Sequence, residues 1–293
     1  MNKTMCPLVW VDGEMRSYKE AFISPATHSL HYGTSVYEGI RFYNTEKGPA
    51  LFRLGDHLRR LEHSAKAMEM ALPFSEDTLT KAVCGLVRAS GYEEGYVRPI
   101  VFLGEGLGLT EEVETHVAIM VLPWGKTSET PLALKTVKVN KVQTPERAKV
   151  GGAYFQSYYE CRRAKAEGFD DVLFVTTPHR LVTETSVGNF FCVRVGGLVY
   201  PENPLIFPGI TRGTILDLAR VLEIPVYQEK LYATLMGGWF EVFITGTARE
   251  VTAIEKIDHT VFDVHKTTLR LKSLYTRVVH GQEPEFVSWL TYV

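Results

Sequence analysis

The sequence has few cysteines, almost no net charge and no long apolar run. Its four cysteines, Cys6, Cys84, Cys161 and Cys192, lie too far apart to form a metal-binding or redox motif. We therefore expect reduced packing residues, no metal site and a cytoplasmic protein. The 32 basic and 34 acidic residues leave a formal net charge of -2. This balance provides no basic field for nucleic acid or anionic lipid, so we expect a small-molecule partner.

Long apolar segments are missing as well. Nowhere do about 18 uncharged apolar residues follow one another, and the N-terminus has no apolar run of signal-peptide length. We therefore expect neither a membrane span nor export. The apolar content of 45%, with 11% aromatic residues, is that of a globular protein. A chain of 293 residues is long enough for two domains, each with its own core.

A polar segment without periodicity marks the expected domain boundary. It reads KTSET at 126–130, between Gly125 and Pro131. We predict an N-terminal α/β domain over 1–125, an interdomain linker over 126–133 and a C-terminal α/β domain over 134–293. The C-terminal domain would carry Lys149.

Apolar spacing predicts helices and strands in both domains. In the first, we expect a helix capped by Asp56, a second capped by Ser75, and strands at 8–11, 36–43, 96–103 and 116–122. In the second, we expect strands at 134–142, 172–176, 190–195 and 240–245. Its predicted helices cover about 153–167, the segment after Pro208-Gly209, and about 266–280. The glycine-rich run at 104–108 has the wrong spacing for nucleotide binding and is predicted to be a flexible pocket loop.

Lys149 lies in an apolar, glycine-rich segment, RAKVGGAY at 147–154. A lysine needs a neutral amine to attack a carbonyl, and burial beside small residues lowers a lysine pKa by penalising the ammonium form. The paired glycines would let the backbone approach a flat ligand closely. The segment favours Schiff-base chemistry, although a lysine taken alone is more often exposed. Other residues must therefore support the hypothesis.

Two segments are suited to binding an anion. Pro208-Gly209-Ile210-Thr211 precedes an amphipathic helix, whose free N–H groups and dipole favour negative charge. Thr245-Gly246-Thr247 is a second turn with hydroxyl groups and glycine. Either segment could also be an ordinary turn or helix start. Arg60 could add a guanidinium group for a dianion.

A cofactor such as pyridoxal 5'-phosphate would need further partners besides Lys149 and a phosphate site. Glu184 could keep the pyridine nitrogen protonated, so that the ring accepts electrons from the substrate. Tyr154, five residues after Lys149, could hydrogen-bond the ring oxygen. As alternatives, Glu184 could be a surface glutamate and Tyr154 a core aromatic residue.

Five motifs in order make the chain recognisable: HYGTSVYEGIR at 31–41, YVR at 96–98, AKVGG at 148–152, PGITR at 208–212 and TGTA at 245–248. Together they resemble the branched-chain amino acid aminotransferases. This family belongs to fold type IV of the pyridoxal phosphate enzymes, which is like the D-amino acid aminotransferase fold. The resemblance extends over about residues 8–258 and implies a two-domain α/β protein with the cofactor between its domains.

The resemblance also implies roles for individual residues. It makes Lys149 the catalytic Schiff-base lysine, Glu184 the partner of the pyridine nitrogen and Tyr154 the partner of the ring hydroxyl. The residues implied for the cofactor phosphate and its turns are Arg60, Gly209, Ile210, Thr211, Gly246 and Thr247. The residues implied for the substrate are Tyr32, Tyr37, Gly39, Arg41, Tyr96, Arg98, Leu109, Trp124, Thr247 and Ala248.

Within the substrate set, Arg98 would receive the side-chain carboxylate of glutamate, while Thr247, Ala248 and Tyr96 would hold the α-carboxylate. Tyr32 and Leu109 would come from a partner subunit, which implies a homodimer or a higher assembly of dimers. The chain departs from the family pattern at four positions that border the cofactor or substrate. Ala153 stands where asparagine is common, Tyr37 for phenylalanine, Leu109 for valine and Phe207 for leucine. These changes affect the substrate range, because one methylene or hydroxyl shifts preference by about 1–3 kcal/mol.

The expected activity is transfer of the amino group between branched-chain L-amino acids and 2-oxoglutarate. Other enzymes of this fold remain as alternatives: D-amino acid or (R)-amine transaminases and aminodeoxychorismate lyase. A further alternative is a catalytically silent pyridoxal phosphate carrier. The presence of Lys149, Glu184 and Thr211 argues against that carrier.

Overall fold

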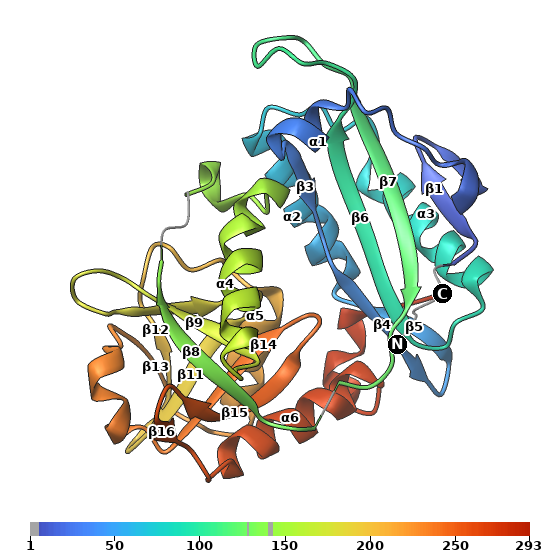
Figure 1. Ribbon diagram of the computed structural model, residues 1–293. Helices are drawn as coiled ribbons and strands as arrows, with labels where there is room; N and C mark the ends of the chain where they lie inside the picture. The colour runs from blue at the N-terminus through green and yellow to red at the C-terminus, as the bar shows by residue number, and fades with distance from the viewer. Residues whose placement is uncertain (1–5, 128, 140–142) are drawn as a thin grey trace. The chain divides into compact units, whose positions relative to one another are not determined.

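The computed structural model describes residues 6–127, 129–139 and 143–293 (Figure 1). The chain divides into two compact units. Unit 1 comprises Met1–Lys126, Gln143–Ala153 and Val278–Val293, and unit 2 comprises Thr127–Val142 and Tyr154–Arg277.

This division differs from the predicted boundary at two segments. Residues 143–153, which include Lys149, and the C-terminal residues 278–293 belong to unit 1. Val150 forms a β-bridge with Val36, and the C-terminal strand pairs with strand Gly48–Phe52. These long-range pairings have no periodic signal in the sequence, so the chain's return to unit 1 was not predicted.

Unit 1 is built on an antiparallel sheet of order β17-β5-β4-β6-β7-β1-β2, with β3 paired to β6. Its strands are β1 Leu8–Val11, β2 Glu14–Ser17, β3 Ser35–Tyr37, β4 Ile40–Thr45, β5 Gly48–Phe52, β6 Gly95–Leu103, β7 Thr115–Pro123 and β17 Leu290–Tyr292. The predicted strand at 36–43 is interrupted at Glu38-Gly39 and forms β3 and β4 instead. The other strands predicted for this unit are confirmed to within one residue.

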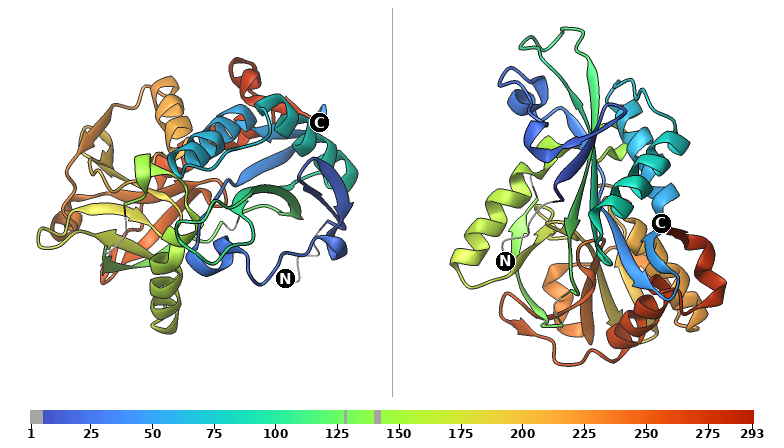
Figure 2. Two further views of the ribbon diagram at one scale, coloured as in Figure 1. Left: turned by 90° about the horizontal axis from the view of Figure 1, so that it is seen from above. Right: turned by 90° about the vertical axis from the view of Figure 1, so that its right-hand side faces the viewer.

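Helices α2 (Leu54–Ala67) and α3 (Glu76–Ser90) cover one face of this sheet, and α1 (His28–Tyr32) is a single short turn (Figure 2). Apolar residues of α2 and α3 are fully buried against β4, β6 and β7. Ser75 caps α3 as predicted, accepting a hydrogen bond from Thr78 N at 3.2 Å. The prediction that Asp56 caps α2 is wrong. The N-cap is Arg53, three residues earlier, which enters the helix with a φ of 56°, and Asp56 pairs with the Arg53 side chain.

Unit 2 is a closed ring of strands. β10 pairs with both β9 and β11, so the order β10-β9-β8-β15-β14-β11 returns to β10, with β12, β13 and β16 attached outside the ring. The strands are β8 Leu132–Lys138, β9 Asp171–Val175, β10 Val182–Thr185, β11 Asn189–Arg194, β12 Gly197–Pro201, β13 Val226–Glu229, β14 Glu241–Gly246, β15 Glu250–Ile257 and β16 Thr260–Val261. Part of the strand predicted at 134–142 and one predicted linker residue, 128, lie outside the described residues.

Alternate residues of these strands fill the ring. Leu173, Val175, Phe190 and Cys192 belong to one buried cluster inside it. The apolar runs in the sequence are nearly continuous because the opposite face of these strands is also buried. Residues between them face outward, where Phe174 packs against α4 and Phe191 stacks on Phe243 at 4.9 Å between ring centroids.

Three helices lie on the outside of this unit: α4 (Phe155–Ala166), α5 (Ile210–Val221) and α6 (Lys266–Val279). α4 packs on β8 and β9, and α5 on β14 (Figure 1). Short 3-10 helices complete the chain at Tyr18–Glu20, Pro145–Arg147, Gly151–Tyr154, Ala233–Gly238 and Pro284–Trp289. Among the described residues, no helix combines the length and the apolar character needed to cross a membrane.

Candidate active site

The backbone of Lys149 is held on both sides in unit 1. Its N–H donates to Ser64 Oγ at 3.0 Å, and its carbonyl accepts from Tyr37 N at 3.2 Å. Ser64 is buried on α2, and the neighbours Ala148 and Val150 are buried at 2% and 8% exposure. The Lys149 side chain starts from this fixed backbone and places Nζ 4.9 Å from the centre of the Tyr37 ring.

The paired glycines after Lys149 serve contact between chain segments. Gly152 N donates to Gly33 O at 3.1 Å, and a Cβ on Gly33 would lie 2.7 Å from Gly152 Cα. A Cβ on Gly151 would lie 2.5 Å from Ser35 Oγ. Gly33 precedes β3 and Ser35 is its first residue. The two glycines therefore allow a close approach between two segments of the chain, whereas the sequence predicted a close approach to a flat ligand.

Aromatic rings and guanidinium groups follow one another from Lys149 across unit 1. Arg98 Cζ lies 4.5 Å from the centre of the Tyr37 ring, and Arg98 Nη2 donates to Tyr96 Oη at 3.1 Å. Tyr96 then packs on Trp124 with ring centroids 5.1 Å apart. A Cβ on Gly39 would lie only 1.7 Å from Tyr96 Oη, so this position has no room for a side chain.

Arg41 belongs to the same group and is almost completely buried, with 2% exposure. Its Nη2 donates to Gly125 O at 3.3 Å, and its Cζ lies 4.8 Å from the centre of the Tyr43 ring. The structure therefore brings together seven residues predicted from the sequence for the substrate or the chemistry: Tyr37, Gly39, Arg41, Tyr96, Arg98, Trp124 and Lys149.

Arg60 is held by a buried carboxylate that was not predicted. Glu38 is fully buried, and its two oxygens accept from Arg60 Nε at 2.6 Å and Arg60 Nη2 at 2.9 Å. His57 Nδ1 lies 2.7 Å from Glu38 Oε2. Burial alone would raise the pKa of Glu38, but the charge of Arg60 and the hydrogen bonds from Arg60 and His57 outweigh it and hold that pKa far below its usual range.

His57 is the neutral member of this Glu38–His57–Arg60 cluster. Burial lowers its pKa more than Glu38 raises it, so the imidazole is uncharged at neutral pH and donates its Nδ1 hydrogen to the carboxylate. One signal for the cluster was present in the sequence. Glu38 is a charged residue inside the apolar run at 36–43, and His57 and Arg60 are one helical turn apart.

In unit 2, Glu184 lies on β10 and contacts the segment that leads into α5. It is 7% exposed, and its Oε2 accepts from Phe207 N at 2.9 Å. A register shift between Val182 and Thr185 breaks the alternation of β10. Such a bulge re-aims side chains. Val182 remains inside the ring, while Glu184 contacts the segment before α5.

The two predicted anion segments are neighbours in unit 2. Gly209 is the N-cap of α5, followed by Ile210 and the buried Thr211. Thr245-Gly246 ends β14, against which α5 packs. Thr247 and Ala248 follow in the turn, which Arg249 N closes by donating to Gly246 O at 3.1 Å.

Three predicted residues stand apart from these groups. Leu109 is 74% exposed and Tyr32 is 43% exposed on unit 1, where Tyr32 Oη donates to Leu107 O at 2.6 Å. Tyr154 precedes α4 in unit 2 and lines a hollow with Ser157, Ser186 and Val187.

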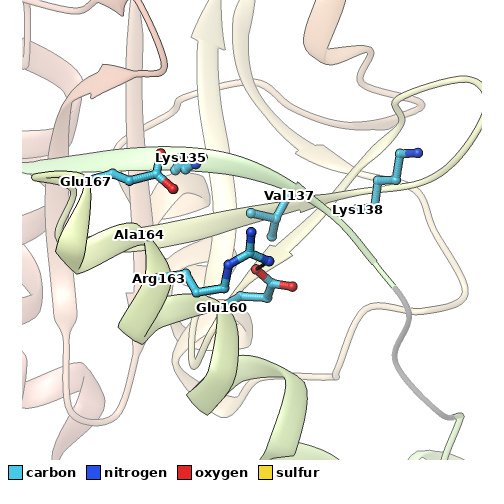
Figure 3. Close-up of a pocket in the computed structure, with 7 residues that line it drawn as sticks. All are labelled: Lys135, Val137, Lys138, Glu160, Arg163, Ala164 and Glu167. Carbon is cyan, nitrogen blue, oxygen red and sulfur yellow. Dashed lines mark hydrogen bonds and ion pairs between the residues drawn. The ribbon is translucent and has the colours of Figure 1, made fainter.

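A groove between α4 and β8 contains none of the predicted residues (Figure 3). It is lined by Lys135, Val137, Lys138, Glu160, Arg163, Ala164 and Glu167. Lys135 pairs with Glu167, and Arg163 pairs with Glu160 at 3.6 Å. Because most of its charges are paired within the groove, it is not a candidate for the anion site.

The chain is similar to known proteins along most of its length. The profile of the amino-transferase class IV family matches residues 35–257. A branched-chain-amino-acid aminotransferase of Pseudomonas aeruginosa is 34% identical, over 98% of this chain and 97% of the relative.

Two solved structures are similar along almost their whole length. The branched-chain aminotransferase of Thermoproteus uzoniensis with norvaline has a TM-score of 0.93 and 33% identity, covering 98% of this chain and 99% of the other. The branched-chain amino acid aminotransferase of Thermobaculum terrenum in its PLP-form has a TM-score of 0.91 and 28% identity, covering 98% of both chains. The fold, the ordered motifs and these matches agree, and the chain belongs to the class IV aminotransferases, in the family of the branched-chain enzymes, and is a transaminase.

Proposed function

We propose that this transaminase moves the amino group between leucine, isoleucine or valine and 2-oxoglutarate, with pyridoxal 5'-phosphate as its cofactor. The names of its relatives support the branched-chain substrates, and the PLP-form of the Thermobaculum terrenum enzyme supports the cofactor. The observation that carries the proposal is the position of Arg98, which contacts both Tyr37 and Tyr96 next to the Lys149 amine.

The residues present fit such a cofactor. Thr245 Oγ1 is completely buried and finds no hydrogen-bond partner among the described residues, as expected of a group whose partner is a ligand. A Cβ on Gly246 would lie 2.9 Å from Val187 O, so the turn is compact. α5 begins beside this turn, and a helix N-terminus favours a phosphate. Arg60, Ile210, Thr211 and Thr247 would hold the phosphate.

When bound, pyridoxal 5'-phosphate supplies a carbonyl carbon that bonds amines and a ring that accepts electrons. Lys149 would hold the cofactor through Nζ and would also be the base that takes the proton from the substrate Cα. Glu184 would keep the pyridine nitrogen protonated, and Tyr154 would hydrogen-bond the ring oxygen. The fixed backbone of Lys149 limits the positions that Nζ can reach, which favours proton transfer.

The substrate side chain must be apolar in one half of the reaction and a carboxylate in the other. Tyr37, Tyr96 and Trp124 provide aromatic surface for the apolar side chain. Arg98 would pair with the carboxylate of glutamate or 2-oxoglutarate, whose burial without a partner would be costly. Thr247 and Ala248, with Tyr96, would hold the α-carboxylate.

A substrate panel tests this function. L-leucine, D-alanine, 1-phenylethylamine and aminodeoxychorismate are each offered to the enzyme, and amino transfer to 2-oxoglutarate is measured. We expect turnover with L-leucine. Preference for D-alanine or for 1-phenylethylamine would point to the other transaminases of this fold, and consumption of aminodeoxychorismate to a lyase. A K149A variant should lose both turnover and the visible absorbance of the bound cofactor, whereas K138A, an exposed lysine, should keep both.

We also propose that two copies of the chain form the active unit and that the enzyme works in the cytoplasm, where Cys6 and Cys192 would stay reduced. The exposed side chain of Leu109 supports the dimer, since a second copy would cover it. The mass in solution, measured by light scattering, tests the assembly. An L109E variant should weaken the dimer, because it adds a charge to a surface that the partner would bury.

A further inference from the structure

Three polar residues form a row across adjacent strands of unit 2. Glu184 on β10 pairs with Asn189 on β11, and Asn189 pairs with Thr245 on β14. Residues that are directly opposite in antiparallel strands have their side chains on the same face. Phe190, the next residue, points into the ring, so this row lies on its outer face. All three side chains are at least nine-tenths buried.

Two members of the row hold the same residue in the segment that leads into α5. Asn189 Nδ2 donates to Phe207 O at 2.9 Å, while Glu184 Oε2 accepts from Phe207 N at 2.9 Å. The backbone of Phe207 is thus held from both ends by side chains of the sheet. Phe207 lies two residues before the N-cap Gly209, so these bonds hold the segment immediately before α5.

Gly209 shows how closely Asn189 fits against this segment. Its φ of -69° and ψ of 133° are open to any residue, so its backbone conformation does not require glycine. A Cβ at this position would instead lie 2.0 Å from Asn189 Oδ1. The Asn189 amide is held at Phe207 and therefore occupies the space of the missing side chain.

We propose that Asn189 is a positioning residue for the phosphate-binding end of α5. It holds the carbonyl of Phe207 and fills the space beside Gly209, and so keeps the first N–H groups of the helix aimed at the phosphate. This inference rests on the proposed cofactor site, to which it adds a residue that does not itself touch the cofactor.

The effect of Asn189 on the phosphate can be separated from any effect on the ring. The full-length apo chain is titrated with pyridoxamine 5'-phosphate and with pyridoxamine, which differ only in the phosphate and need no covalent bond to Lys149. In the N189A variant, Phe207 O loses its buried donor, and we expect the phosphate compound to bind about tenfold more weakly. Pyridoxamine should bind both proteins equally well.

A matched control is N203A. Asn203 Oδ1 accepts from Leu205 N at 3.0 Å, in the same connecting segment that contains Phe207 and Gly209. Its removal should leave the affinity for both compounds unchanged. Circular dichroism and thermal unfolding of each variant confirm that the chains compared are folded.

The possible outcomes distinguish the inference from the function on which it rests. If N189A binds both compounds as the wild type does, or loses affinity for both equally, Asn189 does not position the phosphate end. If the wild type itself does not prefer the phosphate compound, the proposed phosphate site is wrong, whatever Asn189 does.

A second pair of variants remains informative even if N189A is poorly folded. In the wild-type background, G209A forces the new Cβ against Asn189 and should weaken binding of pyridoxamine 5'-phosphate about tenfold, as loss of the Asn189 contact does. In the N189A background, the same change should have little further effect, because the space is now empty. An equal loss in both backgrounds would overturn the proposed fit between Asn189 and Gly209.

Discussion

The two units hold their proposed catalytic residues by different means. Around Lys149 in unit 1, a fully buried carboxylate, Glu38, pairs with Arg60 and His57. Beside Glu184 in unit 2, an amide and a glycine fit together, and the bonds run to backbone atoms of Phe207. A charge cluster depends on its partners and on pH, whereas the fit around Asn189 depends mainly on shape. The two regions should therefore respond differently to mutation and to acid.

The largest difference should follow from removing the buried charge of unit 1. E38Q leaves the Arg60 guanidinium, with a side chain only 15% exposed, without its anion. We expect the free energy of unfolding to fall by about 3–5 kcal/mol in chemical denaturation. The control E76Q removes a carboxylate that pairs with Arg59, where the side chains are 42% and 57% exposed, and should cost about 0–1 kcal/mol. Similar losses in the two variants would show that the cluster is not an important source of stability.

A second prediction separates the charge of Glu184 from its contact with Phe207. E184Q keeps an oxygen that accepts from Phe207 N, so its stability should stay close to that of the wild type. Activity should fall about 100-fold or more, because the pyridine nitrogen loses its anionic partner. E184A should lose activity and also stability, by about 1–3 kcal/mol, because Phe207 N is left without an acceptor. Full activity of E184Q would refute the proposed role of the charge.

The smallest expected effect is a loss of stability in acid that arises in unit 1. The pKa of His57 is lowered from 6.5, so below that pH the unfolded chain takes up a proton that the folded chain does not, and stability falls. Glu38 acts in the same direction below its ordinary value of 4.5, since its folded pKa is lowered too. Each unit of pKa difference contributes about 1.4 kcal/mol.

Denaturation curves between pH 7 and pH 4 measure this loss. H57Q should flatten the decline that begins near pH 6.5, because the titrating group is gone. H63Q is the matched control on the same helix, with a side chain that is 48% exposed, and should follow the wild-type curve. If H57Q declines as steeply as the wild type, another group causes the acid sensitivity.

Most elements were predictable where the pattern is local. The capping residue Ser75 and the apolar spacing after it identify α3, and the apolar runs at 96–103 and 116–122 identify β6 and β7. Elements that depend on distant partners were missed. β17 is three residues long and exists through its pairing with β5, which lies far away in the sequence. A short strand without a periodic pattern gives no signal of its own.

The candidate residues show the same limit. The ordered motifs were enough to select Lys149 and Arg98, because residue type and order persist without coordinates. Asn189 was not selected, since its importance comes from one bond to Phe207 and from the space beside Gly209. Glu38 was inside a quoted motif but received no role, because its burial and its partners His57 and Arg60 appear only in the fold.

The sequence by itself determined the chemistry available to this protein: a lysine among small residues, hydroxyl-glycine turns for an anion, and an arginine beside tyrosines. The tertiary structure decided which unit contains Lys149 and which groups hold it in place. It also decided that the paired glycines 151–152 contact Gly33 and Ser35. The sequence gives the residue types directly, but burial and contact depend on pairings between segments that are distant in the sequence. Those pairings place a glutamate or an asparagine where its side chain positions other residues.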